Sequence, residues 1–179
     1  YTLGWAVAKS LEYCKANFTE DSTLEHISGK CKADGTLADG VFDAWTVTIL
    51  SNSVPDGGCS CVWKRKSDVA KPPCKVSDPR AYAPAWEVSP DNYFLDWRVN
   101  SSDIGPLLKW DTKFTMEVFP GITAKSHLNN GGDNVPMETD DRLPVVYVRR
   151  SNPDVEKKKT HVYINGTTGE VINELETDI

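Results

Sequence analysis

The residues of this chain most able to do chemistry are its five cysteines, which all fall within the first 74 of its 179 positions. They are Cys14, Cys31, Cys59, Cys61 and Cys74. Cysteine at this density is typical of proteins that fold in an oxidising compartment, where thiols pair as disulfides. We therefore expect an extracytoplasmic location, which means secreted, periplasmic or on the cell surface.

The patterns around the cysteines predict how they pair. Cys31 lies on the apolar side of a predicted short strand. Cys14 lies on the apolar side of a predicted helix that should cover that side of the strand, so we predict a Cys14–Cys31 disulfide. Cys59 and Cys61 stand two apart on an extended segment, where their side chains point the same way but are poorly placed to bond each other. One of them should bond Cys74. The other could be buried, could join a second chain, or could pair with a partner.

A metal site is the alternative use of these side chains. Cys59, Cys61 and Cys74 could offer three thiolates, but a C-x-C pair without a nearby second pair or histidine is poor spacing for zinc. Residues 129–134 and 140–141 supply the Asn and Asp oxygens that calcium prefers, in an order that matches no EF-hand loop. Disulfides and a solvated loop are the favoured interpretations, and we predict no metal and no cofactor.

Catalytic signatures are missing from the sequence. Its three histidines, His26, His127 and His161, stand beside no recognisable nucleophile, and no serine-hydrolase, zinc-protease, P-loop or dinucleotide motif occurs. We therefore expect no enzyme activity. An unrecognised small hydrolase is an alternative, and it would need a cleft that brings one histidine beside a serine or a carboxylate.

Six tryptophans offer material for an aromatic binding surface. Trp45 and Trp97 occupy the apolar sides of predicted strands and are interpreted as core residues. Trp86, in a proline-rich segment, and Trp110, at the end of a weak helical pattern, are freer to be exposed. A carbohydrate-binding module that uses Trp86 and Trp110 is therefore a further alternative.

Charge narrows the range of partners. The net charge of −6 argues against nucleic acid or an anionic membrane, because either calls for a concentrated basic surface. The basic runs at 64–66 and 157–159 are short and are interpreted as solvated strand ends. No stretch approaches the roughly 20 apolar residues of a membrane-spanning helix. The start at Tyr1 rather than Met is compatible with a processed chain or with a lipid anchor upstream.

The elements that must position these residues are one long helix and a series of strands. Residues 3–18 carry apolar side chains three and four apart, which predicts an amphipathic helix. Alternation of apolar and polar residues predicts strands at 27–31 and 45–49. A turn at 55–58 connects the strand at 45–49 to a further strand at 59–63, so these two strands are predicted to form a hairpin.

The rest of the chain predicts a second, mainly β region. Residues 67–92 contain five prolines and predict a linker or crossing loop. A short helical turn at 101–110 is weakened by Gly105 and Pro106, and 126–142 predict a polar loop. Further strands are expected at 95–99, 114–118, 145–149, 160–164 and 171–172.

Together these elements predict an α+β fold with the N-terminal helix packed on an antiparallel sheet. Residues 1–66 should form a unit of helix and antiparallel strands, and residues 93–179 a mainly β unit, with 67–92 between them. The two units could also pack as one domain.

Two stretches resemble the PepSY and PepSY-like domains of exported bacterial proteins. The tail at 161–172, H-V-Y-I-N-G-T-T-G-E-V-I, is similar to the terminal strand and T-G-E-V turn of that family. The front is a helix followed by L-E-H-I-S-G-K at 24–30, a D-G turn and A-W-T-V-T at 44–48. It resembles the family's helix, short strand and tryptophan-bearing strand.

The resemblance implies small helix-on-sheet units, related in shape to cystatins, that bind or restrain other proteins rather than catalyse. The hairpin at 145–171 echoes that at 45–63, which fits two degenerate copies, the second having lost most of its helix. We therefore expect a non-enzymatic exported domain that binds or restrains an unidentified protein, or that forms part of a surface assembly.

Overall fold

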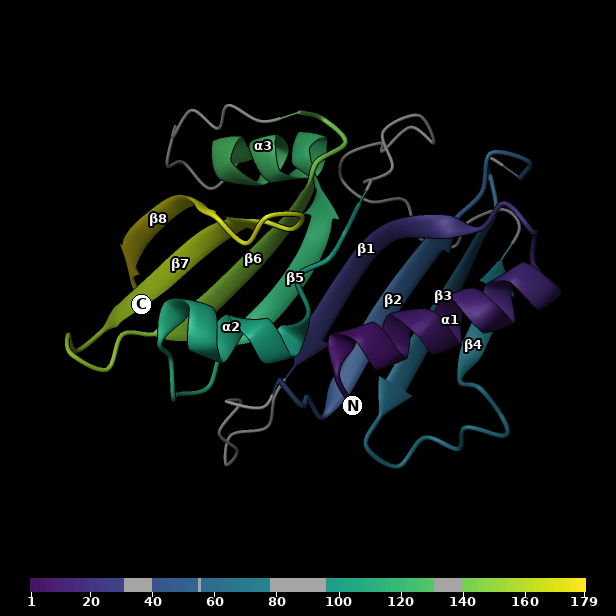
Figure 1. Cartoon of the computed structure of the whole chain (residues 1–179), viewed down its shortest axis with the longest axis horizontal. Coiled ribbons are helices and arrows are strands. Elements are labelled where there is room, and N and C mark those ends of the chain that lie inside the picture. The colour runs from purple at the N-terminus through teal and green to yellow at the C-terminus, as the bar shows by residue number, and fades with distance from the viewer. Residues whose placement is uncertain (31–39, 55, 78–95, 131–139) are drawn as a thin grey trace.

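The computed structural model describes the chain except for residues 31–39, 55, 78–95 and 131–139. Its elements, in chain order, are α1 (Leu3–Asn17), β1 (Thr23–Lys30), β2 (Ala44–Leu50), β3 (Gly58–Lys64), β4 (Cys74–Ser77), α2 (Ser101–Leu108), β5 (Thr115–Pro120), α3 (Gly121–Asn130), β6 (Pro144–Ser151), β7 (Lys158–Asn165) and β8 (Val171–Asp178). The strands form one antiparallel sheet in the order β4-β3-β2-β1-β5-β6-β7-β8 (Figure 1). The predicted α+β fold, with the N-terminal helix on an antiparallel sheet, is confirmed.

The sheet is built from two units that meet in its middle. In each unit a helix precedes four strands, α1 before β1–β4 and α2 before β5–β8, with α3 inserted after β5. We call these the first and the second unit. Strands run outward in chain order from the centre, where β1 pairs with β5 in an antiparallel ladder that includes Ile27 and Val118 (Figure 1). The two units therefore share one continuous sheet.

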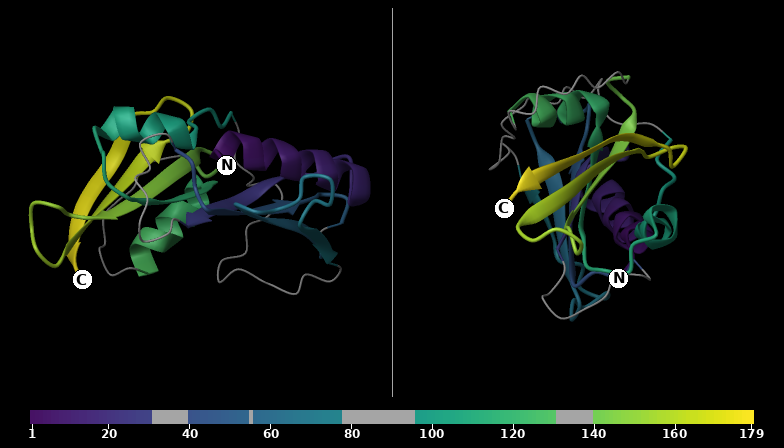
Figure 2. Two further views of the ribbon diagram at one scale, coloured as in Figure 1. Left: turned by 90° about the horizontal axis from the view of Figure 1, so that it is seen from below. Right: turned by 90° about the vertical axis from the view of Figure 1, so that its left-hand side faces the viewer.

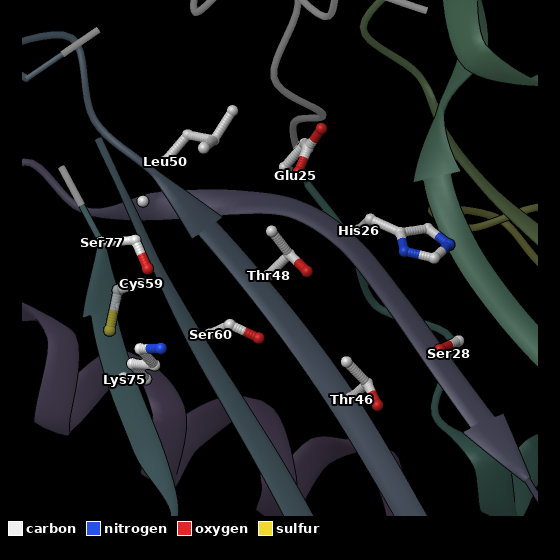
Figure 3. Close-up of a pocket in the computed structure, with 11 residues that line it drawn as sticks. Glu25, His26, Ser28, Thr46, Thr48, Leu50, Cys59, Ser60, Lys75 and Ser77 are labelled. Carbon is white, nitrogen blue, oxygen red and sulfur yellow. The ribbon is translucent and has the colours of Figure 1, made fainter. Parts of the chain in front are cut away.

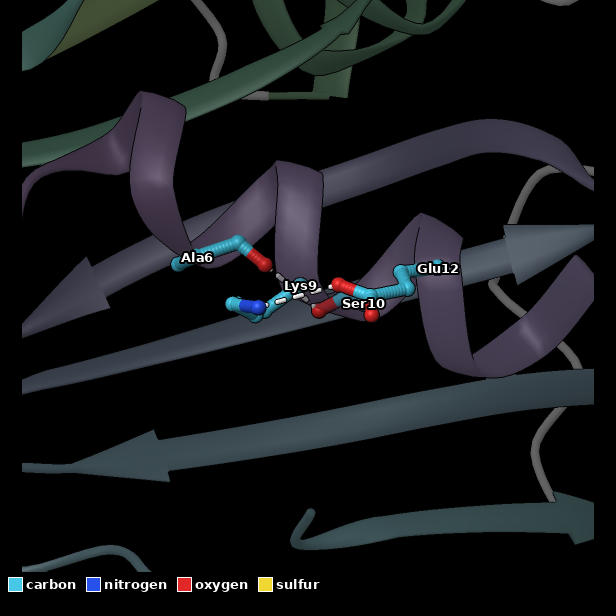
Figure 4. Close-up of polar contacts among 4 residues, drawn as sticks. All are labelled: Ala6, Lys9, Ser10 and Glu12. Atoms are coloured by element: carbon cyan, nitrogen blue, oxygen red, sulfur yellow. Dashed lines mark hydrogen bonds and ion pairs between the residues drawn. The ribbon is translucent and has the colours of Figure 1, made fainter. Parts of the chain in front are cut away.

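Helix α1 covers one face of the first unit and is fastened to it by a buried serine. The Ser10 hydroxyl donates a hydrogen bond to the Ala6 carbonyl (2.8 Å) and accepts one from Trp63 Nε1 of β3 (2.9 Å). Lys9 and Glu12 form an ion pair beside Ser10 on the helix (Figure 4). The indole N–H of Trp63 thus keeps a partner in the core, as a buried donor must.

The main apolar core lies between the sheet and the helices α1 and α2, which lie on the same face (Figure 2). Among its largest fully buried side chains are Trp45, Trp63, Phe42, Phe114 and Ile104. A smaller cluster lies on the opposite face of the second unit, where Ala124 of α3 packs with Phe119, Val145, Tyr147 and Tyr163. Both faces of the second unit are therefore covered at least in part.

The second unit has a helix, contrary to the expectation that most of it was lost. Helix α2 forms although Gly105 and Pro106 lie within it. A capping box of Asn100 and Asp103 begins the helix and satisfies amides of its first turn. Burial of Ile104 in the core adds apolar stabilisation that the local propensity of a proline-containing segment does not reveal.

Other element boundaries also differ from the sequence predictions. Strand β4 lies within the predicted linker at 67–92, because pairing with β3 orders the residues that follow the proline pair. Residues 96–100 form no strand, since amides of this segment donate to the Gly166 carbonyl instead of to a ladder. Helix α3 extends into the predicted loop at 126–142, and β8 is longer than the two residues predicted for it.

Candidate functional site

Cys14 pairs with Cys59, so the predicted Cys14–Cys31 disulfide is wrong. The alpha carbons of Cys14 and Cys59 lie 6.0 Å apart, and both side chains are buried. Helix α1 and strand β1 run in opposite directions, so the last turn of α1, which contains Cys14, lies toward the end of the sheet where β1 begins (Figure 1). The other end of β1, at Lys30, lies roughly 23 Å from Thr23 at about 3.3 Å per residue. Cys31 itself lies outside the described residues.

Cys61 pairs with Cys74 across β3 and β4, which confirms that one of Cys59 and Cys61 bonds Cys74. The sulfur atoms of Cys14, Cys59 and Cys61 lie within 4.8 Å of one another. All three are disulfide-bonded, and a disulfide sulfur is not the thiolate that a zinc site takes. The two disulfides instead tie α1 to β3 and β3 to β4.

Trp110 is buried, with 7% of its surface exposed, which corrects the expectation that it is free to bind a ligand. The left-handed residue Lys109 ends α2 and turns the chain, so that the indole enters the core beside Phe114. Trp45 is buried as predicted. Trp86 lies outside the described residues.

His26 of β1 and His161 of β7 are separated in the sheet by β5 and β6. In His161, Nδ1 lies 2.8 Å from the Tyr147 hydroxyl and Nε2 lies 2.7 Å from Thr177 Oγ1. The ring of His26 stacks on Phe119, with 6.3 Å between the ring centroids. The side chain of His127 lies outside the described residues.

The face of β1–β4 opposite α1, which we call the open face, contains a hollow of about 360 Å³. Within the described residues no helix covers it. A row of polar side chains crosses all four strands there (Figure 3). His26 lies opposite Thr48, Thr48 opposite Ser60, and Ser60 opposite Lys75.

Strand alternation explains why this face is polar. Trp45, Val47 and Ile49 turn into the core, so that Thr46 and Thr48 lie on the open face. Hydroxyl groups both donate and accept hydrogen bonds. The row can therefore bind a group that presents donors and acceptors in alternation.

The other lining residues determine which kinds of ligand the hollow can bind. Glu25 is buried at the β-bulge that precedes His26, and Leu50 supplies an apolar wall. No tryptophan, tyrosine or phenylalanine belongs to the lining in the described part of the chain. The ring of His26 turns toward β5 and away from the hydroxyls of Thr48 and Ser60 (Figure 3).

Both disulfides lie behind this hollow. Cys59 contributes to its lining and is bonded to Cys14 of α1. Cys61, two residues along β3, is bonded to Cys74 of the edge strand β4. These cross-links hold β3 and β4 in place, so the hollow is formed before a ligand binds and less order has to be imposed on binding.

No family model, curated protein or solved structure matches this chain. Among the helices that the structure describes, none has the length and apolar character needed to cross a bilayer.

The sequence marks His26 as one of three histidines, but no motif in it marks Thr48, Ser60 or Lys75. The signal was present in β2, where threonines alternate with core residues. What the pattern lacked was the order of strands in space. Only that order places polar side chains from separate segments in one row.

Proposed function

We propose that this chain is a non-enzymatic, exported domain that binds an extended segment of another protein on the open face. The observation that best supports this is the polar row from His26 to Lys75 in a hollow of about 360 Å³. Ligand pockets span about 300–1,000 Å³ and are mostly apolar, with a few polar groups that orient the ligand. The hydroxyls that line this hollow can play that part for the amides and carbonyls of an extended chain.

The edge of the sheet gives such a segment a place to pair. In the part of the chain that the structure describes, β4 is the last strand on its side of the sheet, and its outer edge has no paired strand. An extended chain that pairs with the outer edge of β4 places alternate side chains on the open face next to Lys75. Lys75 is exposed there, so we expect the segment to carry an acidic side chain opposite it.

Export and a PepSY-like relationship are parts of the same proposal. Two disulfides suit an oxidising compartment, where such bonds form and persist. One helix against four antiparallel strands in each unit is compatible with the helix-on-sheet shape that the resemblance implies. Domains of that kind bind or restrain other proteins.

The two alternatives have less support. A carbohydrate site built on Trp110 conflicts with the burial of that residue, and the hollow on the open face offers no tryptophan in the described residues. A serine hydrolase needs a base within reach of the nucleophile. The ring of His26 is directed away from Ser60 (Figure 3).

Selection of a random peptide display library on the immobilised protein tests the proposal. We expect extended sequences with Asp or Glu to be enriched. Thr48→Glu should weaken their binding at least about tenfold, since it adds a repelling charge and bulk at the centre of the row. Thr168→Glu, with the same change on an exposed turn, is the matched control and should bind as the wild type does.

Two results would contradict the proposal. Equal binding by Thr48→Glu and wild type would exclude the open face as the site. Hydrolytic turnover in a broad substrate screen, abolished by changing one polar residue, would exclude a non-enzymatic role.

A further inference from the structure

A second hollow, of about 190 Å³, lies where β5 begins, β6 ends and β7 begins. We call it the basic hollow. Six of its lining residues are cationic or carry a hydroxyl group: Lys113, Thr115, Arg149, Arg150, Ser151 and Lys159. Strand pairing brings them together, because Thr115 lies opposite Arg149 and Ser151 lies opposite Lys159.

The positive charge of the basic hollow is not balanced locally. Within the described residues, no acidic side chain lines it, and none of the ion pairs involves one of its four cations. The chain as a whole carries a net charge of −6, so this cluster runs against its composition. Like charges held close together repel one another, and an anion bound between them removes that repulsion.

Arg150 is held in position by its neighbours. Its guanidinium carbon lies 4.2 Å from the ring centroid of Trp110, and Nη1 donates to Thr112 Oγ1 at 3.3 Å. Its Nε is buried and has no hydrogen-bond partner in the described part of the protein. A buried donor without a partner is costly, which favours an acceptor at this position.

We infer that the basic hollow binds a tetrahedral oxyanion, a phosphate or sulfate group carried by a ligand. Arginine offers a planar fork of donors and lysine a compact charge, and both bind such oxygens strongly. Four cations and two hydroxyls from β6, β7 and the chain at the start of β5 suit a group with three or four oxygens better than a carboxylate with two. The volume is below the roughly 300 Å³ at which pockets for whole small molecules begin, so it fits the anionic group alone. None of these residues belongs to the hollow on the open face.

Isothermal titration calorimetry with inorganic phosphate and with sulfate, at fixed ionic strength, tests the inference. We expect saturable binding to the wild type with a dissociation constant of about 1 mM. Arg149→Gln/Lys159→Gln removes two cations of the hollow and should weaken binding at least about tenfold, since each contributes a charge-assisted hydrogen bond. Lys64→Gln/Lys66→Gln removes the same charge from an exposed strand end and should leave binding unchanged.

A second variant and two larger probes complete the experiment. Arg150→Lys keeps the charge but loses the planar fork, so it should bind more weakly than the wild type while circular dichroism shows an unchanged fold. Binding of a phosphoserine peptide alone would identify a phosphorylated partner, and binding of a sulfated disaccharide alone a sulfated glycan; either supports the site. Equal weakening in both double variants, or no saturable binding of phosphate or sulfate at millimolar concentrations, would overturn it.

Discussion

The two units of the sheet share an order of elements but differ in what covers them. In the first unit, the long helix α1 packs on one face, and the opposite face is open in the described residues. In the second unit, the short helix α2 covers the core face, and α3 packs on the other face against Phe119 and Tyr147. Both disulfides of the described part belong to the first unit.

The pattern of buried residues along the strands reflects this difference in coverage. In β2 buried residues alternate with half-buried ones, whereas β6 is buried without interruption from Pro144 to Val148. A strand covered on one face alternates in this way, and one covered on both faces does not. The first unit thus lacks the stabilisation that burial of apolar area under a second layer would provide, and its two disulfides offset that lack. The structural consequence is a fixed, polar surface that remains available for binding.

Removal of the Cys14–Cys59 disulfide should therefore have the largest effect on stability. This bond joins residues 45 apart, and Cys14→Ala/Cys59→Ala is expected to lower the free energy of unfolding by about 4 kcal/mol through loop entropy. Cys61→Ala/Cys74→Ala opens a separation of 13 and should cost less, about 3 kcal/mol. Guanidinium denaturation under non-reducing conditions measures both losses.

Hydrogen exchange gives the control for this comparison. If the disulfides serve the first unit, Cys14→Ala/Cys59→Ala should speed amide exchange in α1 and β3 more than in β6 and β7. Equal acceleration in both units would show that the sheet opens as one cooperative body. The two units would then not differ in their local free energy of opening.

The sequence was sufficient for elements that depend on local periodicity. The helix over 3–18 and the strands at 45–49, 145–149 and 160–164 all carry patterns that repeat within a few residues. Helix α2 was underestimated because Pro106 lowers the local propensity, while burial of Ile104 is a tertiary gain.

The partner of Cys14 and the open face could not be predicted in the same way. The pairing depends on the direction in which α1 crosses the strands, and two cysteines on apolar faces do not define that direction. The open face depends on which strands are neighbours, since Thr48, Ser60 and Lys75 come from separate segments. Local patterns determine which side of a strand is polar, but the order of strands determines which polar sides meet.

A smaller effect is expected at Ser101, which joins the two units. Its buried hydroxyl accepts a hydrogen bond from the Leu3 amide (2.9 Å) and donates one to the Gly40 carbonyl (2.6 Å). Ser101→Ala leaves both backbone groups without these bonds, so we expect the free energy of unfolding to fall by about 1–3 kcal/mol. Ser102→Ala, one residue along and only half-buried, should change it by less than about 0.5 kcal/mol. Similar losses in the two variants, by urea denaturation, would mean that Ser101 does not link the units.

The smallest effect is expected at Asp21, in the connection between α1 and β1. Its carboxylate accepts hydrogen bonds from the Ser51 hydroxyl (2.5 Å) and from the amide and hydroxyl of Ser53. These bonds, and the one from Ser51 most of all, hold the pKa of Asp21 well below its ordinary value. A carboxyl whose pKa is lower in the folded state stabilises the fold above its unfolded pKa of about 3.9, and this contribution is lost as the pH falls below that value.

Asp21→Asn should therefore melt below the wild type at pH 7, and the two melting temperatures should converge as the pH falls below about 4. Glu20→Gln, an exposed neighbour, is the control for removal of a negative charge and should show a smaller difference at pH 7. Melting curves between pH 2 and 7 provide the measurement. A difference between Asp21→Asn and the wild type that stays constant across this range would show that the charge of Asp21 does not contribute. The connection between α1 and β1 would then depend on the neutral hydrogen bonds alone.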